Sequence, residues 1–439
     1  MPNLLKGSKK LLNAWAFYDW ANSVYSLVIA SAIFPIYYQA LFKSENITTV
    51  SLLGGTIRST PLISYITAAA FLVVAIISPL LSGIADYVGN KKNFMKFFCY
   101  LGALSCMGLY FFSIENIEIS LLFYFFGLIG FWGSLVFYNS YLPDVAFPEQ
   151  QDRVSARGYS MGYVGSVVLL LFNLGMVMNP ELFGFGEGGK ASMEAMRWSF
   201  VTVGIWWILF SQYSFYLLPK GNKSGKKVTT KILMNGFREL KSVYNSLSEN
   251  IQLKSFLAAF FVYSMAVQTV MLVATYFGEQ EIAWGGDDAK TFGLIVSILI
   301  IQLVAVGGAI LTSRASEKFG NIPVLIVINI IWVCICVAAF FIESPLQFYM
   351  TAGVVGMVMG GIQSLSRSTY SKFLPETKDT TSYFSFYDVA EKIGIVIGML
   401  IYGFIDQITG SMRNSILFLV LFFITGVILL LRVPRNKTN

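Results

Sequence analysis

Long apolar runs recur along almost the whole chain and strongly limit what it can fold into. From residue 13 to residue 432 they alternate with short charged connections. Each run reaches about 20 residues, enough to cross a hydrocarbon core of about 30 Å. Hydrophobic residues make up 56% of the 439 residues and charged residues only 13%, whereas roughly a quarter of an average soluble domain is charged. The sequence therefore predicts an all-α membrane protein.

Twelve apolar segments are expected to form transmembrane helices, six on either side of a polar linker. The first six lie at 13–41, 61–85, 93–114, 120–142, 156–179 and 197–218, and the second six at 255–278, 291–313, 322–342, 346–373, 383–405 and 414–432. We therefore expect a first six-helix bundle over 1–218, a linker over 219–254 and a second bundle over 255–439.

The linker alternates apolar and basic residues at helical spacing, as in Phe237 and Leu240 beside Arg238 and Lys241. This pattern predicts an amphipathic helix on the membrane surface. A tether between the two bundles is the simpler interpretation, and a membrane-sensing or partner-binding element is the alternative.

Lysine and arginine gather in the connections on one side of the expected membrane. They include Lys91 and Lys92 after the second segment, whereas the opposite connections carry few basic residues. Short basic loops stay on the cytoplasmic side. Because twelve crossings bring both termini to one side, we expect both termini to be cytoplasmic.

Two pairs of similar stretches relate the two halves. Residues 138–144 read Tyr-Asn-Ser-Tyr-Leu-Pro-Asp and 370–376 read Tyr-Ser-Lys-Phe-Leu-Pro-Glu, each at the end of the fourth helix of its half. Residues 81–90 and 312–321 match at nearly the same spacing, at the end of each second helix. Six helices duplicated in one orientation are typical of secondary transporters, in which two bundles rock about a central site.

Polar side chains inside the expected spans are the candidates for substrate binding, since each is expensive in hydrocarbon and needs a partner or a purpose. Arg367 is the foremost candidate, because a guanidinium at that depth needs an anion. Glycines precede it at 356, 360 and 361, and these we assign to close helix packing. The full set of candidates is Asp19, Trp20, Asn22, Ser26, Ser264, Gln268, Gln363 and Arg367.

A second set of residues is expected to act at the gate or in coupling. Asp86 precedes a glycine turn and a basic pair, and it could cap the positive end of a neighbouring helix in one state and release it in the other. The remaining candidates are Gly89, Arg153, Arg157, Asp388, Glu391 and Lys392.

Coupling by protons would have to run through carboxylates, because the chain contains no histidine. Asp19 and Glu391 are the candidates. Asp388 and Lys392 stand four residues apart, so a purely structural ion pair is the alternative interpretation there.

Other classes of function find little support in the composition. The net charge of +7 comes from basic residues in the connections, which form no face for nucleic acid. All four cysteines lie in apolar runs and are expected to be small buried or lipid-facing residues, not a disulfide or metal framework. We therefore expect no metal, no cofactor and no enzyme activity, since an acyl- or glycosyl-transferring enzyme would normally show a histidine or metal-ligand cluster.

The stretch from Ser82 to Lys92 resembles the signature of the major facilitator superfamily, Gly-x-x-x-Asp-Arg-x-Gly-Arg-Arg. Asp86 and Gly89 match it. Tyr87 stands in place of the arginine after the aspartate, so the usual arginine partnership of that aspartate is absent.

A narrower resemblance covers nearly the whole chain. It is similar to the UMF branch of that superfamily, the bacterial relatives of the fungal vacuolar amino-acid effluxers of the autophagy-related group. The stretches that carry it are 15–23 with Phe34 and Pro35, 141–144 with 152–158, 361–368 and 386–388. Met265 and Ala266 depart from it, since many members carry an acidic residue and a glycine there.

This resemblance implies a major-facilitator fold and export or exchange of a small solute by alternating access, with amino acids or related metabolites as substrate. It also implies a multi-pass protein of the bacterial inner membrane, and we expect a monomer surrounded by lipid, with proton or ion coupling. A lipid translocase or a non-transporting membrane sensor on the same scaffold is the alternative.

Overall fold

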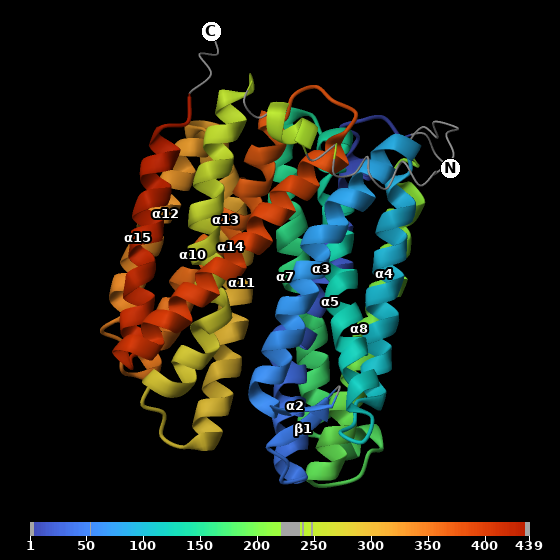
Figure 1. Cartoon of the computed structure of the whole chain (residues 1–439), viewed down its shortest axis with the longest axis vertical. Coiled ribbons are helices and arrows are strands. Elements are labelled where there is room, and N and C mark those ends of the chain that lie inside the picture. Colours follow the sequence, from blue (N-terminus) through green and yellow to red (C-terminus); the bar gives the residue numbers. More distant parts are fainter. Residues whose placement is uncertain (1–3, 53, 221–237, 239–240, 247–248, 435–439) are drawn as a thin grey trace.

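The computed structural model describes residues 4–52, 54–220, 238, 241–246 and 249–434, and these ranges are almost entirely helical. The chain forms two helical halves, drawn in blue and green and in yellow, orange and red in Figure 1. The amphipathic helix expected in 219–254 lies mostly outside the described residues. Within that segment residues 241–246 are helical, and Val243 is buried.

Every segment expected to be a helix is helical. The first half contains α1 (Lys9–Val24), α2 (Ile33–Ser44), α3 (Ser59–Val88), α4 (Lys91–Gly108), α5 (Ile117–Asn139), α6 (Leu142–Val145), α7 (Pro148–Met178) and α8 (Gly189–Leu217). The second contains α10 (Ile251–Glu281), α11 (Asp287–Phe319), α12 (Asn321–Ala339), α13 (Pro345–Phe373), α14 (Thr380–Thr409) and α15 (Met412–Leu431). Single turns η2 (Leu109–Phe111) and η3 (Pro180–Phe183) end α4 and α7.

Eleven helical segments of the described residues are long and apolar enough to cross a membrane. The helix α14 is not among them, although it has 30 residues, and it carries charges at Asp388, Glu391, Lys392 and Asp406. The count of twelve crossings and the cytoplasmic side of the termini therefore stay predictions.

The first span differs from the regular helix that we expected. A π-helical segment, η1 (Tyr25–Ala32), separates α1 from α2. Pro35 follows it and has no backbone N–H to donate to the carbonyl four residues earlier, so a regular helical hydrogen-bond ladder cannot continue through this point.

A small hairpin is a second difference from the expected all-helical chain. Strands β1 (Thr49–Leu52) and β2 (Gly55–Arg58) pair antiparallel in the connection before α3. They form a two-stranded sheet in which Val50 is buried against the core of the first half, and the chain remains all-α in character.

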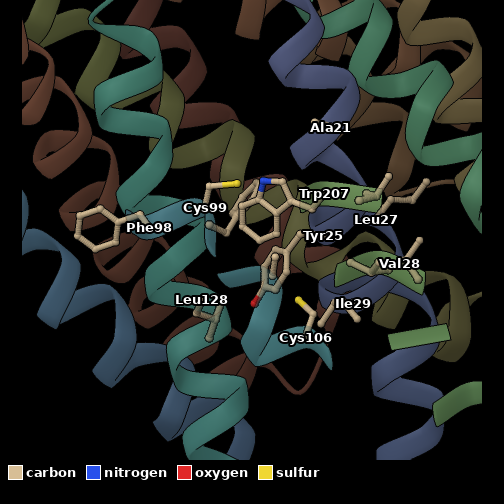
Figure 2. Packing of buried hydrophobic residues seen from close by; sticks show 14 of the residues in the cluster. Ala21, Tyr25, Leu27, Val28, Ile29, Phe98, Cys99, Cys106, Leu128 and Trp207 are labelled. Atoms are coloured by element: carbon tan, nitrogen blue, oxygen red, sulfur yellow. The ribbon is translucent and has the colours of Figure 1, made fainter. Parts of the chain in front are cut away.

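Aromatic rings and small residues fill the core of the first half. Figure 2 shows the indole of Trp207 on α8 lying over the ring of Tyr25, with Cys99 and Cys106 beside them. A β-carbon on Gly102 would lie 2.5 Å from the Trp207 ring, so α4 and α8 approach closely because that position has no side chain. The cysteines at 99, 106 and 336 are buried, Cys334 is exposed, and all four are free.

The second half has a separate core around Trp332, whose ring stacks on Phe423 with centroids 5.5 Å apart. Two pairs of long helices join the halves, α7 with α11 and α3 with α14, and α13 also packs on α7. In Figure 1 α14 crosses obliquely between the halves. A site that both halves build is therefore expected along these helices.

Candidate functional site

The guanidinium of Arg367, on α13 of the second half, is buried against three helices of the first half. Its Nη2 donates to Asp19 Oδ2 of α1 at 3.2 Å and to the carbonyl oxygen of Ser155 of α7 at 3.0 Å. Its Nε donates to Ser155 Oγ at 3.0 Å, and its Nη1 to Asn139 Oδ1 of α5 at 3.2 Å. The side chains of Arg367 and Asp19 are only 3% and 6% exposed, so this ion pair is closed to solvent.

Three aromatic rings complete this environment. The Arg367 guanidinium carbon lies 4.1 Å from the ring centroid of Tyr159, 4.8 Å from that of Trp15 and 5.5 Å from that of Tyr138. Such cation–π contacts stabilise a desolvated cation by up to about 2 kcal/mol. Tyr138 also donates to Asp19 Oδ2 at 2.8 Å. We call Asp19, Tyr138, Asn139, Ser155 and Arg367 the Arg367 cluster.

Gly158 makes room for the Arg367 cluster. A β-carbon at this position would lie 2.4 Å from Asp19 Oδ2 and 3.1 Å from Arg367 Nη2. The structure shows that what packs against it is the ion pair itself.

A second charged group lies on α14. Lys392 Nζ donates to Asp388 Oδ1 at 2.8 Å and to Glu391 Oε2 at 3.2 Å, and Gln268 Nε2 of α10 donates to Glu391 Oε1 at 2.9 Å. These four residues form the Lys392 cluster. Lys392 Nζ also lies 3.6 Å from the ring centroid of Trp132 on α5, so the cluster faces the first half.

The two clusters lie near each other. The Tyr159 hydroxyl is close enough to feel the charges of Arg367 and Asp19, from one cluster, and of Glu391, from the other. Gln363, one turn before Arg367, accepts a hydrogen bond of 2.8 Å from Tyr163 of α7. The rings of Tyr159 and Tyr163 therefore both lie at the contact between the halves.

The other candidates for substrate binding are more dispersed. Trp20 stacks on Trp206, and the backbone carbonyl of Trp20 accepts the indole N–H of that ring. Asn22 and Ser264 are buried, whereas Ser26 is exposed within η1. Their binding role, like that of the whole set, stays a prediction.

Asp86, at the end of α3, lies against the positive end of a helix of the other half. Its Oδ2 accepts the backbone N–H of Ser382 at 2.8 Å and its Oδ1 that of Thr381 at 3.3 Å. Both N–H groups belong to the first turn of α14, where helix donors lack partners within the helix. Gly89 ends α3 with φ of 67°, a conformation that glycine adopts without strain.

The internal repeat gives Asp86 a counterpart. Glu317, at the matching position near the end of α11, accepts three hydrogen bonds from Arg153 of α7, the shortest at 3.0 Å. Each half therefore extends a carboxylate to the start of a helix in the other half. We call this end of the bundle, where α13 ends and α14 begins, the junction end.

Further contacts between the halves at the junction end were missed by sequence reasoning. Asp152 accepts from Lys372 Nζ at 2.6 Å and from Asn321 Nδ2 at 2.9 Å. Lys91 donates to Thr380 Oγ1 at 3.0 Å and pairs with Asp144. The repeated stretches contain Asp144, Asn321 and Lys372, but nothing in the sequence showed which of these residues face each other.

Arg157 differs from its neighbour Arg153. It bonds to Asn13 of α1, within the same half, and its side chain is exposed. The structure does not bring it to the contact between the halves, so its role in coupling stays a prediction.

The family is decided by comparison with known proteins. The sequence model of the family described as vacuole effluxer Atg22 like matches residues 7–439. The chain belongs to this family. It is also 30% identical over 440 residues to the "Uncharacterized MFS-type transporter YxiO" of Bacillus subtilis, covering 99% of this chain and 97% of that protein. Autophagy-related protein 22 of Eremothecium gossypii is 26% identical over 307 residues, which cover 65% of this chain and 57% of the relative.

Solved structures give the fold of this Atg22-like chain. The human organic anion transporter MFSD10 matches with a TM-score of 0.70 at 11% identity, covering 96% of this chain and 99% of that one. The transporter FucP in the outward conformation matches with a TM-score of 0.65 at 15% identity, covering 97% and 99%. The chain therefore has the major-facilitator fold, and it is a multi-pass membrane protein of the transporter class, as the resemblance implied.

Proposed function

We propose that this Atg22-like protein is a secondary transporter that moves a small solute across the cell membrane by alternating access. The observation that carries the proposal is the Arg367 cluster, a buried ion pair whose two charges come from different halves. The halves cannot separate at the junction end without breaking it. The pair is therefore suited to close the path in one state and open it in another.

Opening would leave two charges in need of new partners. A buried charge that loses its partner is strongly destabilising, by about 3–5 kcal/mol. A zwitterionic amino acid offers both replacements, a carboxylate for Arg367 and an ammonium group for Asp19. The resemblance to fungal amino-acid effluxers supports the same substrate class.

Both termini are expected to be cytoplasmic, which would make the junction end the cytoplasmic one. The pairs Asp86 with α14 and Glu317 with Arg153 would then hold the cytoplasmic side closed. Transport would alternate between this state and one in which these contacts are broken.

Thermal stabilisation of the purified protein tests the substrate class, because a ligand that binds the native state raises its apparent stability. The panel comprises amino acids, short peptides, sugars, nucleosides and organic anions. We expect stabilisation by one or more free amino acids, lost when the amine is acetylated or the carboxylate amidated. We also expect it to be lost in Arg367→Ala.

Uptake of the stabilising compound into liposomes that contain the protein then separates transport from binding. Equal stabilisation by a free amino acid and by its acetylated or amidated derivative would contradict binding of the zwitterion by Arg367 and Asp19. Stabilisation by no member of the panel would favour a lipid substrate or a sensor.

A further inference from the structure

A groove on the outer surface of the first half lies apart from the Arg367 cluster. It runs between α1, α7 and α8 and has a volume of about 430 Å³, within the range of about 300–1,000 Å³ that is typical of small-molecule sites. Asn13 supplies an amide group and Arg157 a positive charge. The rest of the lining is Phe17, Met161, Leu209, Phe210 and Tyr213.

The groove is polar at one end and apolar along its length. Asn13 and Arg157 lie near the starts of α1 and α7, and Phe17 and Met161 follow each of them one turn deeper. The helix α8 runs the opposite way, since Ser214 near its end donates to the carbonyl oxygen of Ala14 at 2.7 Å.

Two basic residues precede the polar end on α1. Lys9 and Lys10 stand one turn before Asn13 on α1, and both are exposed. Together with Arg157 they give this end of the groove a positive charge, while its floor is aromatic and aliphatic.

Arg157 is incompletely satisfied. A guanidinium has five N–H donors, and that of Arg157 bonds to the neutral amide oxygen of Asn13. Among the described residues no carboxylate forms an ion pair with it, unlike Arg153, Arg367 and Arg413. A guanidinium beside hydrocarbon is costly unless an anion accompanies it.

We propose that this groove binds an anionic phospholipid. The phosphate would accept from Arg157, with Lys9 and Lys10 nearby, and an acyl chain would lie along Phe17, Met161 and Leu209. The groove opens on membrane-spanning helices, and Leu209 is 63% and Tyr213 42% exposed, so its surroundings are lipid tails. An arginine beside an apolar channel matches a phosphate on a hydrocarbon chain in charge and in shape.

The test titrates the purified full-length protein, in a neutral detergent, with phosphatidylglycerol or phosphatidylcholine of the same acyl chains. Bound lipid is counted by native mass spectrometry, and the thermal midpoint is followed in parallel. Arg157→Gln removes the charge at the groove, and Met161→Trp fills its apolar part but keeps the charge. Arg314→Gln is the control, because Arg314 is an exposed arginine of α11 outside the groove.

We expect tight binding of one phosphatidylglycerol and a larger midpoint shift than with phosphatidylcholine. Arg157→Gln should weaken that binding by about fivefold or more, as expected for one basic side chain at an anionic headgroup, and Met161→Trp should weaken it as well. Arg314→Gln should leave it unchanged.

Three results would overturn the proposal. One is equal binding of the two lipids by the unaltered protein. Another is unchanged phosphatidylglycerol binding in Arg157→Gln. The third is an effect of Arg157→Gln without any effect of Met161→Trp, because that would mean a headgroup adsorbed at the surface with no chain in the groove.

Discussion

At the scale of single residues, the environment of Arg367 is more complete than its sequence context suggests. Asp19, Ser155 and Asn139 accept its hydrogen bonds, and three aromatic rings surround it. The free-energy cost of desolvating Arg367 and Asp19 is therefore offset in this state by contacts from both halves. The same completeness makes the cluster sensitive to any change in its packing.

Gly158→Ala should break the ion pair without removing a charge. The added methyl group would lie 2.4 Å from Asp19 Oδ2, so the carboxylate or the backbone has to move. We expect a loss of about 1–3 kcal/mol in stability, typical of overpacking, and strongly reduced transport. Denaturation and liposome uptake measure the two effects.

Gly175→Ala is the matched control for Gly158→Ala. It lies on the same helix, and a β-carbon there meets no atom within 4 Å. It should be neutral or slightly stabilising, because alanine favours a helix over glycine. Equal effects of the two substitutions would show that helix propensity, and not the ion pair, is responsible.

Asp19→Asn should separate charge from shape at the same site. The amide keeps the size of the carboxylate and can still accept from Tyr138 and Arg367, but it cannot take up a proton to become neutral. If Asp19 carries the coupling proton, uptake driven by a pH gradient is lost. Exchange of substrate across the membrane persists, but only at higher substrate concentration, because the neutral amide also binds the ammonium group of the substrate more weakly. An unchanged pH profile of uptake would exclude Asp19 as the coupling residue and leave Glu391 as the remaining candidate.

At the scale of elements, the first turn of α14, in the second half, is capped by a residue of the first half. Asp86 accepts two of its backbone N–H groups and the Ser382 hydroxyl at 2.9 Å. A carboxylate at a helix N-terminus is favourable both for these hydrogen bonds and for the helix dipole. The cap therefore depends on the arrangement of the halves.

Asp86→Ala should favour the state in which the junction end is open. Loss of a cap costs about 1 kcal/mol, which changes the ratio of closed to open protein by about fivefold. Alkylation of a cysteine placed at Ser140, which is buried beside Thr381, would report the opening in a Cys334→Ser background. We expect a faster reaction in Asp86→Ala.

Glu376→Gln is the control for Asp86→Ala. This exposed carboxylate lies in the same connection between α13 and α14 and forms no ion pair among the described residues. It should leave the alkylation rate unchanged. The same rate in Asp86→Ala would show that the cap contributes nothing to closure.

At the scale of the whole molecule, contacts between the halves gather at the junction end through residues of both repeats. The ion pair of Arg153 and Glu317 is largely exposed and worth only about 0.2–1 kcal/mol. Closure is therefore the sum of several weak contacts and one buried pair, which suits a state that must also open.

A bis-maleimide cross-linker with a disulfide in its spacer, reacted with Arg153→Cys and Glu317→Cys, should stop transport, because it joins the halves at the junction end. Reduction should restore it. Cross-linking Arg413→Cys to Glu281→Cys is the matched control, since that ion pair, 2.7 Å in length, lies within the second half. Full transport with the first pair cross-linked would contradict rocking of the halves.

The sequence by itself determined the class of the protein, the positions of its helices and the repeat. These follow from local physics, because an apolar run of a given length has few alternatives in a membrane. The sequence also indicated that Asp86 could cap a neighbouring helix, but not that this helix is α14. The π-helical interruption and the hairpin were not predicted.

Only the tertiary structure decided which polar groups meet. Arg367 was recognised as needing an anion, but the distance along the chain to Asp19 gave no indication that Asp19 supplies it. The contacts of Asp152 and Lys372, and the role of Gly158 beside the ion pair, were likewise absent from any local pattern. Partners across two halves depend on how the bundles pack, and hydrophobic periodicity carries that information only for the apolar face of each helix.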